Sequence, residues 1–341
     1  MTPDLSEAIL AKHLQPIRGM ALAQAIFAAF ELGVLDELKG GGQSVHELGR
    51  LLSLDVERLR GLVEFLENES LVQYNSDNVE LTASGVELLA VRPWYELLVG
   101  GYAATFGQLP EVLKEGATYA SRNGAYVGVG SCGISQHDAL PMVFELLGHG
   151  PLPSAIVDIG CGDGTFLADI ATRYPNVMCV GVEPDQGARS AAQAEANERG
   201  LDNLRVVAGD ALNFDDAGVP RPPGTLYITA FVLQELLEQA GEAAVVKLLA
   251  DTFVQDPAAA WIVIEVDRRH PLPVEDSGLA LGYYNPYFLI HRITEQRLAP
   301  ISEWRRLFDM AGLEVVAEVF PERNYDSLGI KFGHLLRLRE A

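Results

Sequence analysis

The spacing of apolar residues changes near residue 150 of this 341-residue chain. Before that point, residues 20–38 (MALAQAIFAAFELGVLDEL) repeat apolar side chains every three or four positions, which predicts helix. These apolar residues occupy most faces of the helix rather than a single stripe. Because such a helix needs to be buried, we expect a second copy of the chain to cover it.

Residues 44–89 carry a helix, turn, helix and hairpin pattern. Ser44 precedes a short helical stretch, Asp55 precedes a longer one, and the tetrapeptides LVQY and VELT flank the turn NSDN. This winged-helix pattern has two interpretations, DNA binding and a dimerisation scaffold. The second helix, DVERLRGLVEFLENE, has more acids than bases, whereas a phosphate-reading helix is basic. We therefore predict that residues 1–110 form a winged-helix-like dimerisation domain.

The second half of the chain alternates short apolar runs with helical stretches. Residues 111–150 come first, rich in Gly and Ser with little periodicity, and are predicted to be a connector that covers a site. Residues 151–341 then predict a parallel sheet with helices on both faces, which binds ligands at the carboxyl ends of its strands. The predicted strands lie in AIVDIG, VMCVGVE, LRVVAGD, TLYITAFV and WIVIEVD.

Charge and composition narrow the possible partners. The chain has 25 basic and 47 acidic residues, a formal net charge of −22, which argues against nucleic acid or an anionic membrane as partner. No apolar run reaches about 18 residues and the N-terminus lacks a signal-peptide pattern, so we expect a soluble, cytoplasmic protein. The three cysteines show no CxxC spacing, so a disulfide framework is not expected.

The stretch VDIGCGDGTFL (157–167) predicts a strand, a glycine loop and a helix that together bind a nucleotide cofactor. Its GxGxG spacing differs from the GxGxxG of dinucleotide-binding domains, which remain the alternative. Acids follow three successive strands: Asp158, Glu183, which could hold ribose hydroxyls, and Asp210, which could accept from an adenine amino group. Acids beside the loop suit a cofactor with an ammonium and a sulfonium better than one with a diphosphate.

This pattern resembles the Rossmann-like class I methyltransferases that use S-adenosylmethionine (SAM). Together with the N-terminal half, the chain is similar to the dimeric small-molecule methyltransferases, which implies an α/β SAM domain preceded by an α-helical winged-helix dimerisation domain. The residues that the resemblance places at SAM are Asp158, Gly160, Gly162, Gly164, Glu183, Asp210, Ala211 and Phe231.

Related winged-helix O-methyltransferases carry a general-base His after the fourth strand, where this chain has Gln234 and Glu235. Glu235 could serve as a base, or both side chains could be oxygen ligands of a metal. His291, in an aromatic-rich stretch after the fifth strand, could then complete a set of ligands with open positions for substrate.

The chain also resembles the α-keto acid C-methyltransferases of nonribosomal-peptide pathways, whose members act on phenylpyruvate, 2-ketoarginine or 4-methyl-2-oxovalerate. A phenylpyruvate member has a His-Asp pair where this chain has Gln234 and Glu235, and a later His ahead of DEW, as His291 precedes SEW with Trp304. The resemblance implies one divalent ion, zinc or non-haem iron, on Gln234, Glu235 and His291. It also implies methylation of C3 of a 2-oxo acid through a metal-stabilised enolate, and the His-to-Gln departure leaves the metal open.

Several residues are candidates for the substrate site. Arg122 and Arg297 are candidate carboxylate anchors, and Phe288 is expected to line the pocket with Phe231. Candidates for the base that removes the C3 proton are His137, Asp138, Tyr283 and Tyr284. Two other functions stay open, a metal-free O- or N-methyltransferase with Glu235 as base and a noncatalytic SAM-sensing or DNA-binding protein. The side chain of the keto acid is also open.

Overall fold

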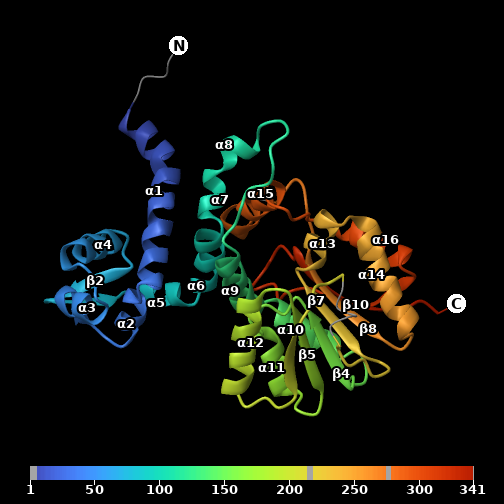
Figure 1. Ribbon diagram of the computed structural model, residues 1–341. Helices are drawn as coiled ribbons and strands as arrows, with labels where there is room; N and C mark the ends of the chain where they lie inside the picture. Colours follow the sequence, from blue (N-terminus) through green and yellow to red (C-terminus); the bar gives the residue numbers. More distant parts are fainter. Residues whose placement is uncertain (1–5, 213–217, 274–277, 341) are drawn as a thin grey trace. The chain divides into compact units, whose positions relative to one another are not determined.

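The computed structural model describes residues 6–212, 218–273 and 278–340 (Figure 1). Contacts between Cα atoms divide the chain into two compact units, Met1–Ala103 and Ala104–Ala341. The division lies close to the domain boundary that the sequence predicts near residue 110. No helix of the described residues is long and apolar enough to span a membrane.

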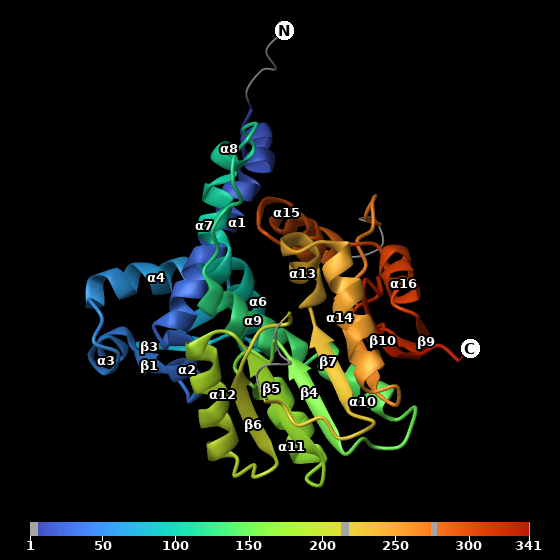
Figure 2. The ribbon, with the colours of Figure 1, turned by 45° about the vertical axis from the view of Figure 1, so that its right-hand side comes forward.

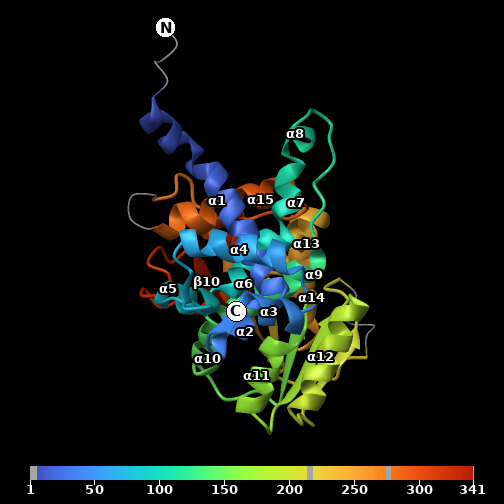
Figure 3. The same cartoon turned by 90° about the vertical axis from the view of Figure 1, so that its left-hand side faces the viewer.

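The first unit has the predicted winged-helix elements (Figure 3). Ser44 Oγ accepts a hydrogen bond from the Glu47 amide at 3.1 Å, and Asp55 Oδ1 accepts one from the Arg58 amide at 2.9 Å, so both predicted N-caps are confirmed. The elements are α1 (Glu7–Glu31), α2 (Val34–Lys39), β1 (Gln43–Ser44), α3 (Val45–Leu51), α4 (Val56–Asn68), β2 (Val72–Asn75), β3 (Asn78–Leu81), α5 (Ala83–Leu89), α6 (Arg92–Tyr95) and the π-helix η1 (Glu96–Gly101).

The apolar stretch 20–38 is buried differently from the expectation. Most of its large side chains, among them Ile26, Phe30 and Leu35, lie in the core of the first unit itself, where the C-terminal half of α1 packs with α2 and α4. Within the stretch, Met20 and Leu32 stay exposed. Along α1, exposed apolar side chains follow one another at Leu10, Leu14, Ile17 and Met20, with exposed fractions that rise from 42% to 65%. Any surface left for a partner on α1 is therefore the earlier stripe.

The second unit contains a seven-stranded sheet in the order β6-β5-β4-β7-β8-β10-β9. All five predicted strands are confirmed, but the sheet is not wholly parallel, because β10 pairs antiparallel with both β8 and β9. Strand β9 follows helix α16, and β10 turns back from it to insert between β8 and β9 in the opposite direction. An antiparallel neighbour needs no crossover helix, and the sequence signal for these two strands was missed. The strands are β4 (Ala155–Ile159), β5 (Met178–Glu183), β6 (Leu204–Ala208), β7 (Leu226–Ala230), β8 (Ala260–Val266), β9 (Leu313–Val319) and β10 (Lys331–Leu338).

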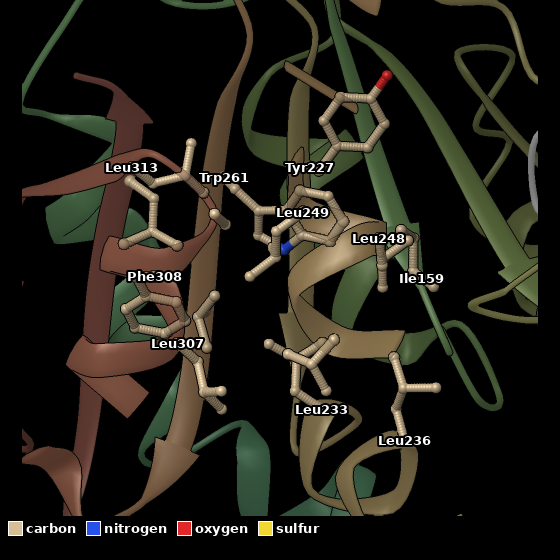
Figure 4. Close-up of a cluster of buried hydrophobic side chains, with 14 of the residues drawn as sticks. Ile159, Tyr227, Leu233, Leu236, Leu248, Leu249, Trp261, Leu307, Phe308 and Leu313 are labelled. Atoms are coloured by element: carbon tan, nitrogen blue, oxygen red, sulfur yellow. The ribbon is translucent and has the colours of Figure 1, made fainter. Parts of the chain in front are cut away.

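Helices cover both faces of this sheet, as predicted. On one face α13, α14 and α16 bury a cluster that includes Trp261, Leu249 and Phe308 (Figure 4). On the other face α10, α11 and α12 bury a second cluster around Ile156, Ile228 and Ile262. The helices of this unit are α7 (Ala103–Gly107), which begins at the division, α8 (Leu109–Val112), α9 (Gly124–Ser135), α10 (Ala139–Leu147), α11 (Thr165–Arg173), α12 (Gln186–Glu198), α13 (Leu233–Gln239), α14 (Glu242–Gln255), the π-helix η3 (Ala280–Tyr284), α15 (Asn285–Ile293) and α16 (Ile301–Met310).

The Gly- and Ser-rich segment 121–138, predicted to be a loop, forms helix α9 over most of its length. Asn123 caps this helix by accepting from the Tyr126 amide. A Cβ added at Gly162 would lie 3.1 Å from Cys132 Sγ, so α9 packs directly on the glycine loop. Close packing of small residues explains why a helix formed where periodicity was weak, and it places this segment beside the predicted cofactor site. The three cysteines are free.

Candidate active site

The glycine loop between β4 and α11 needs its glycines for backbone conformation and for space. Gly160, Gly162 and Gly164 have φ values of 78°, 58° and 77°, in the left-handed region. A Cβ at Gly164 would lie 2.5 Å from Ala192 Cβ, and a Cβ at Gly160 would lie 2.6 Å from Val232 Cγ2. The loop is therefore packed closely against α12 and against the segment that follows β7, with no room for larger side chains at these positions.

Two carboxylates stand beneath this loop. Glu183 Oε2 accepts from the Gly162 amide at 3.0 Å, and its Oε1 accepts from the Asp185 amide at 2.9 Å. Asp158 is buried, and burial together with the charge of Glu183 raises its pKa to about 7. A cationic cofactor would favour the ionised form of Asp158, which suits the ammonium and sulfonium of SAM.

Asp210 is exposed, two residues after β6. Its Oδ1 accepts from the Leu212 amide at 2.8 Å, which fixes the turn that follows the strand, and Ala211 packs against the core of the sheet. Its place after the strand next to β5 matches the expected adenine-binding position.

The segment after β7 brings the candidate chemistry to the glycine loop. Phe231 directly follows β7 with a φ of 61°, a conformation that a non-glycine residue rarely adopts and that often marks a functional site. Val232 packs against Gly160, and α13 begins at the next residue with Gln234 and Glu235 in its first turn. In Figure 2 the arrows of β4, β5 and β7 point to the end of the sheet at which α13 and α15 lie.

Glu235 holds the centre of a polar cluster. Its Oε1 accepts from Arg122 Nη2 at 2.7 Å and from Gln296 Nε2 at 2.9 Å. Gln296 and His291 line one pocket, and the pKa of His291 is lowered in part by the Arg122 charge. These contacts form one site from three separate segments of the chain, with the residues Arg122, Glu235, Gln296 and His291.

His291 is held as a neutral imidazole. Its Nδ1 lies 2.8 Å from the carbonyl oxygen of Tyr287, so Nδ1 carries the proton and Nε2 keeps its lone pair. Burial is the largest cause that lowers its pKa to about 4. A buried histidine with one nitrogen on a backbone carbonyl is the arrangement that metal-binding histidines adopt.

The donor chemistry of the three predicted ligands fits a divalent ion. His291 offers Nε2, Glu235 offers a carboxylate, and Gln234 Oε1 is buried with no hydrogen-bond partner among the described atoms. Arg122 already neutralises Glu235, so an ion would share this carboxylate with a guanidinium. Within the part of the chain described, no group of three or more His, Cys, Asp and Glu side chains is arranged to hold a metal, and this set contains only two such residues beside Gln234.

The other predicted substrate residues lie apart from this polar cluster in different surroundings. Arg297 pairs with Glu303 at 2.6 Å, so its guanidinium is already bound to a carboxylate, and its amide donates to the Gln234 carbonyl. Tyr283, Tyr284 and Phe288 are all buried and pack in one aromatic group. His137 is exposed and stacks on Tyr325.

Two candidate bases are already engaged with charged groups. Tyr284 donates to Asp326, and burial together with that carboxylate raises the pKa of Tyr284 far above its ordinary value. Asp138, another candidate, forms a buried ion pair with Lys331.

Sequence reasoning missed three buried residues of this region and one half-buried residue: Glu265, Lys331 and Asp326, and Tyr325. Glu265 lies in the wholly buried strand β8, its Oε1 accepts from the Gln234 amide at 3.2 Å, and burial raises its pKa to about 8. The acid inside WIVIEVD was a visible signal for it. The others gave no signal, because their neighbours in space come from distant parts of the sequence.

Comparisons with known proteins show that the chain is similar to methyltransferases. A family model described as "Putative methyltransferase" matches residues 153–217. The chain is 43% identical over 338 residues to 2-ketoarginine methyltransferase of Streptomyces arginensis, covering 98% of each chain. It is 27% identical over 298 residues to indolepyruvate C-methyltransferase of Streptomyces griseus, covering 86% of each.

Among solved structures, mitomycin 7-O-methyltransferase superposes with a TM-score of 0.71 at 19% identity, covering 97% of this chain and 98% of that one. The fold and the glycine loop define a SAM-dependent class I methyltransferase with a helical N-terminal domain. At 43% identity over nearly its whole length, the chain belongs to the α-keto acid methyltransferase family that includes 2-ketoarginine methyltransferase.

Proposed function

We propose that this enzyme methylates C3 of an α-keto acid with SAM as methyl donor. The observation that carries the proposal is the cluster of Glu235, Arg122, Gln296 and His291, which is joined to the glycine loop where Val232 packs on Gly160. Both relatives with long alignments are named for keto acids, 2-ketoarginine and indolepyruvate.

The proposed SAM site follows from the acids and the open backbone of the loop. Gly160, Gly162 and Gly164 give SAM access to the backbone, Glu183 accepts from its ribose hydroxyls, and Asp210 accepts from its adenine. Asp158 balances the positive charge of the methionine end. Phe231 and Ala211 complete the walls of this site.

Carbon becomes a nucleophile here only when the adjacent carbonyl acidifies its C–H bond. Removal of a C3 proton from a 2-oxo acid gives an enolate, and its C3 attacks the methyl carbon of SAM in line while the sulfonium leaves as a thioether. The oxygens of the enolate and the carboxylate need cationic or donor groups during this step. Arg122 supplies a guanidinium beside Glu235, and Gln296 orients the same carboxylate.

We further propose that Gln234, Glu235 and His291 hold one divalent ion, either zinc or non-haem iron. Such an ion would supply a Lewis acid, the kind that lowers the pKa of a bound water to about 7. The neutral state of His291 and the bare Oε1 of Gln234 support this assignment. The chain's own contribution is to keep Nε2 of His291 unprotonated and to hold Glu235 between Arg122 and Gln296.

The alternative is a metal-free O- or N-methyltransferase with Glu235 as general base. In the structure Glu235 Oε1 is already engaged by two donors, so a hydroxyl proton would have to displace one of them or use Oε2. Full activity of enzyme that contains no metal would favour this alternative.

We also propose a homodimer, formed through the exposed stripe of Leu10, Leu14, Ile17 and Met20 on α1, in a cytoplasmic enzyme. Four apolar residues at spacings of three and four form a continuous stripe that a second copy would cover. Segment 111–150, with α9 on the glycine loop, is proposed to cover the cofactor.

An anaerobic screen of 2-oxo acids tests the function. Pure enzyme receives SAM, one 2-oxo acid and one of several divalent metals, and the product is read by mass and by the position of the new methyl group. A product that gains one methyl at C3 is expected. Methylation only of hydroxyl or amine acceptors would contradict the proposal, and equal rates with and without chelator would contradict the metal.

A further inference from the structure

A column of aromatic rings runs from the proposed reaction centre to a second buried polar group. The rings of His291 and Tyr287 lie 4.0 Å apart, those of Tyr287 and Tyr283 lie 5.4 Å apart, and Tyr284 packs 5.0 Å from Tyr283. The column belongs to η3 and α15, whose helical spacing places residues four apart above one another. One face of this helical segment therefore connects His291 with whatever lies near Tyr283 and Tyr284.

At the far end of the column stand two carboxylates and one ammonium. Lys331, the first residue of β10, forms an ion pair with Asp138, and its Nζ lies 5.2 Å from the Tyr283 ring centroid and 5.7 Å from that of Phe231. Asp326 receives the Tyr284 hydroxyl on one oxygen and the Leu328 amide on the other at 3.0 Å. The exposed fractions of Asp138, Asp326 and Lys331 are 1%, 2% and 4%.

The charges of this group do not balance. Lys331 offsets Asp138, so Asp326 remains as a buried carboxylate with only a phenol and an amide as donors. Arg269 reaches the same turn, but its guanidinium binds Asp267 and the carbonyl oxygens of Leu328 and Gly329. Among the residues that the structure describes, no Lys, Arg or His forms an ion pair with Asp326. A buried carboxylate without a counter-charge is costly unless a cation completes it.

The rings near Asp326 also suit a cation. Tyr284 donates to Asp326 and packs on Tyr283, whose ring already lies near the Lys331 ammonium, and aromatic faces attract guanidinium and ammonium groups. The pKa of Tyr325 responds to the charges of Asp138, Lys331 and Asp326, so all three groups lie close to its ring. Lys331 stays charged, because Asp138 raises its pKa against the effect of burial.

Building on the proposed function, we propose that Asp326 and the surrounding tyrosines recognise a positively charged side chain on the keto acid. The head of the substrate lies at Glu235 and His291, and its tail follows the aromatic column to Asp326. Tyr284 lies seven residues before His291; along a helix this separation is about 10 Å. A chain of three methylenes with a terminal guanidinium spans this distance once a hydrogen-bond length is added at each end. The 2-ketoarginine side chain has this form.

A series of substrates tests the inference without any mutation. The probes are 2-ketoarginine, its ureido analogue (the keto acid of citrulline), 4-methyl-2-oxovalerate and phenylpyruvate. The ureido analogue has nearly the same shape as the guanidino acid and no charge. We expect wild-type enzyme to bind the guanidino acid at least about 30-fold more tightly than the ureido acid, because a buried carboxylate distinguishes the two by charge.

Variants locate this preference. Asp326→Asn keeps the shape and removes the charge, so it should weaken binding of the guanidino acid by a similar factor and change binding of the ureido acid by less than about 3-fold. Asp326→Glu should restore part of the preference. Asp309→Asn, which removes an exposed carboxylate of α16 paired with Arg339, is the matched control and should leave both affinities unchanged.

Two readouts separate this inference from the proposed function. Calorimetric binding to enzyme saturated with S-adenosylhomocysteine reports on the subsite, and product mass reports on the reaction. Charge-dependent binding that Asp326→Asn abolishes supports the subsite whether or not methylation follows. Equal affinity of wild-type enzyme for guanidino and ureido acids, or tighter binding of 4-methyl-2-oxovalerate, overturns the subsite even if C3 methylation is observed. If Asp326→Asn does not fold, the wild-type series decides alone.

Discussion

The two halves of the active site are built in opposite ways. The proposed SAM half comes from consecutive strands and turns, with three glycines and Glu183 within one stretch of β4, α11 and β5, and it presents mostly backbone. The proposed substrate half joins Arg122, Glu235, Gln296 and His291 from three segments, and it presents side chains. The proposed cofactor site is therefore a short local motif, whereas the proposed substrate site depends on contacts between distant parts of the sequence.

This contrast has a consequence for mutations. A change in the substrate half should stop formation of the enolate and leave SAM affinity nearly intact. A change in the SAM half should weaken SAM binding and leave formation of the enolate nearly intact. A variant that weakened the binding of SAM and of the keto acid equally would show that the division is wrong.

The largest effect is expected at His291 and Glu235. His291→Ala and Glu235→Ala should each lower kcat by about 1,000-fold or more, because each removes a group that acts only on the enolate-forming step. Exchange of the C3 hydrogen with solvent deuterium needs no methyl donor, so NMR of the keto acid isolates this step. SAM affinity by calorimetry should stay within about 3-fold of wild type.

Arg305→Ala, on the exposed side of α16, is the control for these two variants. If His291→Ala still exchanges C3 at the wild-type rate after chelation, the metal assignment is wrong and Glu235 has to be considered as a plain base. Loss of SAM affinity in either variant would contradict the separation of the two halves.

The next effect concerns pH and the SAM half. Asp158 has a folded-state pKa of about 7 against an ordinary value of 3.8, so the folded protein keeps a proton that the unfolded chain has lost. The contribution of Asp158 to the free energy of unfolding is most favourable below pH 3.8. It falls as the pH rises toward 7, by roughly 4 kcal/mol at most. Asp158→Asn does not titrate. Its unfolding free energy, from denaturant titrations between pH 4.5 and 8, should therefore rise relative to wild type as the pH rises.

Glu265, a second buried acid with a raised pKa, is present in both proteins, so its titration cancels in the difference between the two curves. A constant difference across this pH range would mean that Asp158 is ionised in the folded protein without SAM. Asp309→Asn, at an exposed site, should give a curve parallel to that of wild type.

Glu183→Ala is expected to weaken SAM binding by about 100-fold, because it removes the acceptor of the Gly162 amide in the glycine loop and of the Asp185 amide after β5, together with the proposed ribose contact. Calorimetry measures this affinity, and circular dichroism checks that the fold is kept. Glu195→Ala, which breaks the exposed pair with Arg199 on α12, is the control. An unchanged SAM affinity in Glu183→Ala would remove this residue from the site.

How much could be predicted from sequence follows the same division. The glycine loop, Glu183, the five parallel strands and the winged-helix caps at Ser44 and Asp55 were predictable, because each depends on residues within a few positions of one another. Helix α9 was predicted to be a loop, since its glycines hide the periodicity that packing on Gly162 stabilises. Strands β9 and β10 were missed because no helix separates them along the chain, so the alternation of strand and helix ends there.

The substrate half was predictable only in part. Glu235 and His291 were proposed from their places after strands and from a resemblance, and Arg122 only as a candidate carboxylate anchor. The contacts that join this site connect residues 113 and 61 positions apart in the sequence. Lys331 and Asp138 are separated by 193 positions, so no local pattern could indicate that pair. In the sequence, a lysine of a buried long-range ion pair looks the same as a lysine on the surface. Only the fold reveals that it is buried.

The smallest effect on chemistry is expected from the α1 stripe. All the proposed cofactor and substrate residues lie in Ala104–Ala341, whereas Leu14 and Ile17 lie in the first unit. Two lysines at exposed apolar positions should prevent burial against a second copy, because a buried unpaired ammonium is costly. By light scattering at micromolar protein, wild type should have twice the monomer mass and the double variant Leu14→Lys, Ile17→Lys the monomer mass.

Turnover of the monomeric variant should stay within about 3-fold of wild type if the two halves need only the second unit. A monomeric wild type would refute the dimer, and a dimeric variant would move the interface away from this stripe. A monomeric variant without turnover would show that the second copy completes the site, so the division into two halves would have to include a third contribution.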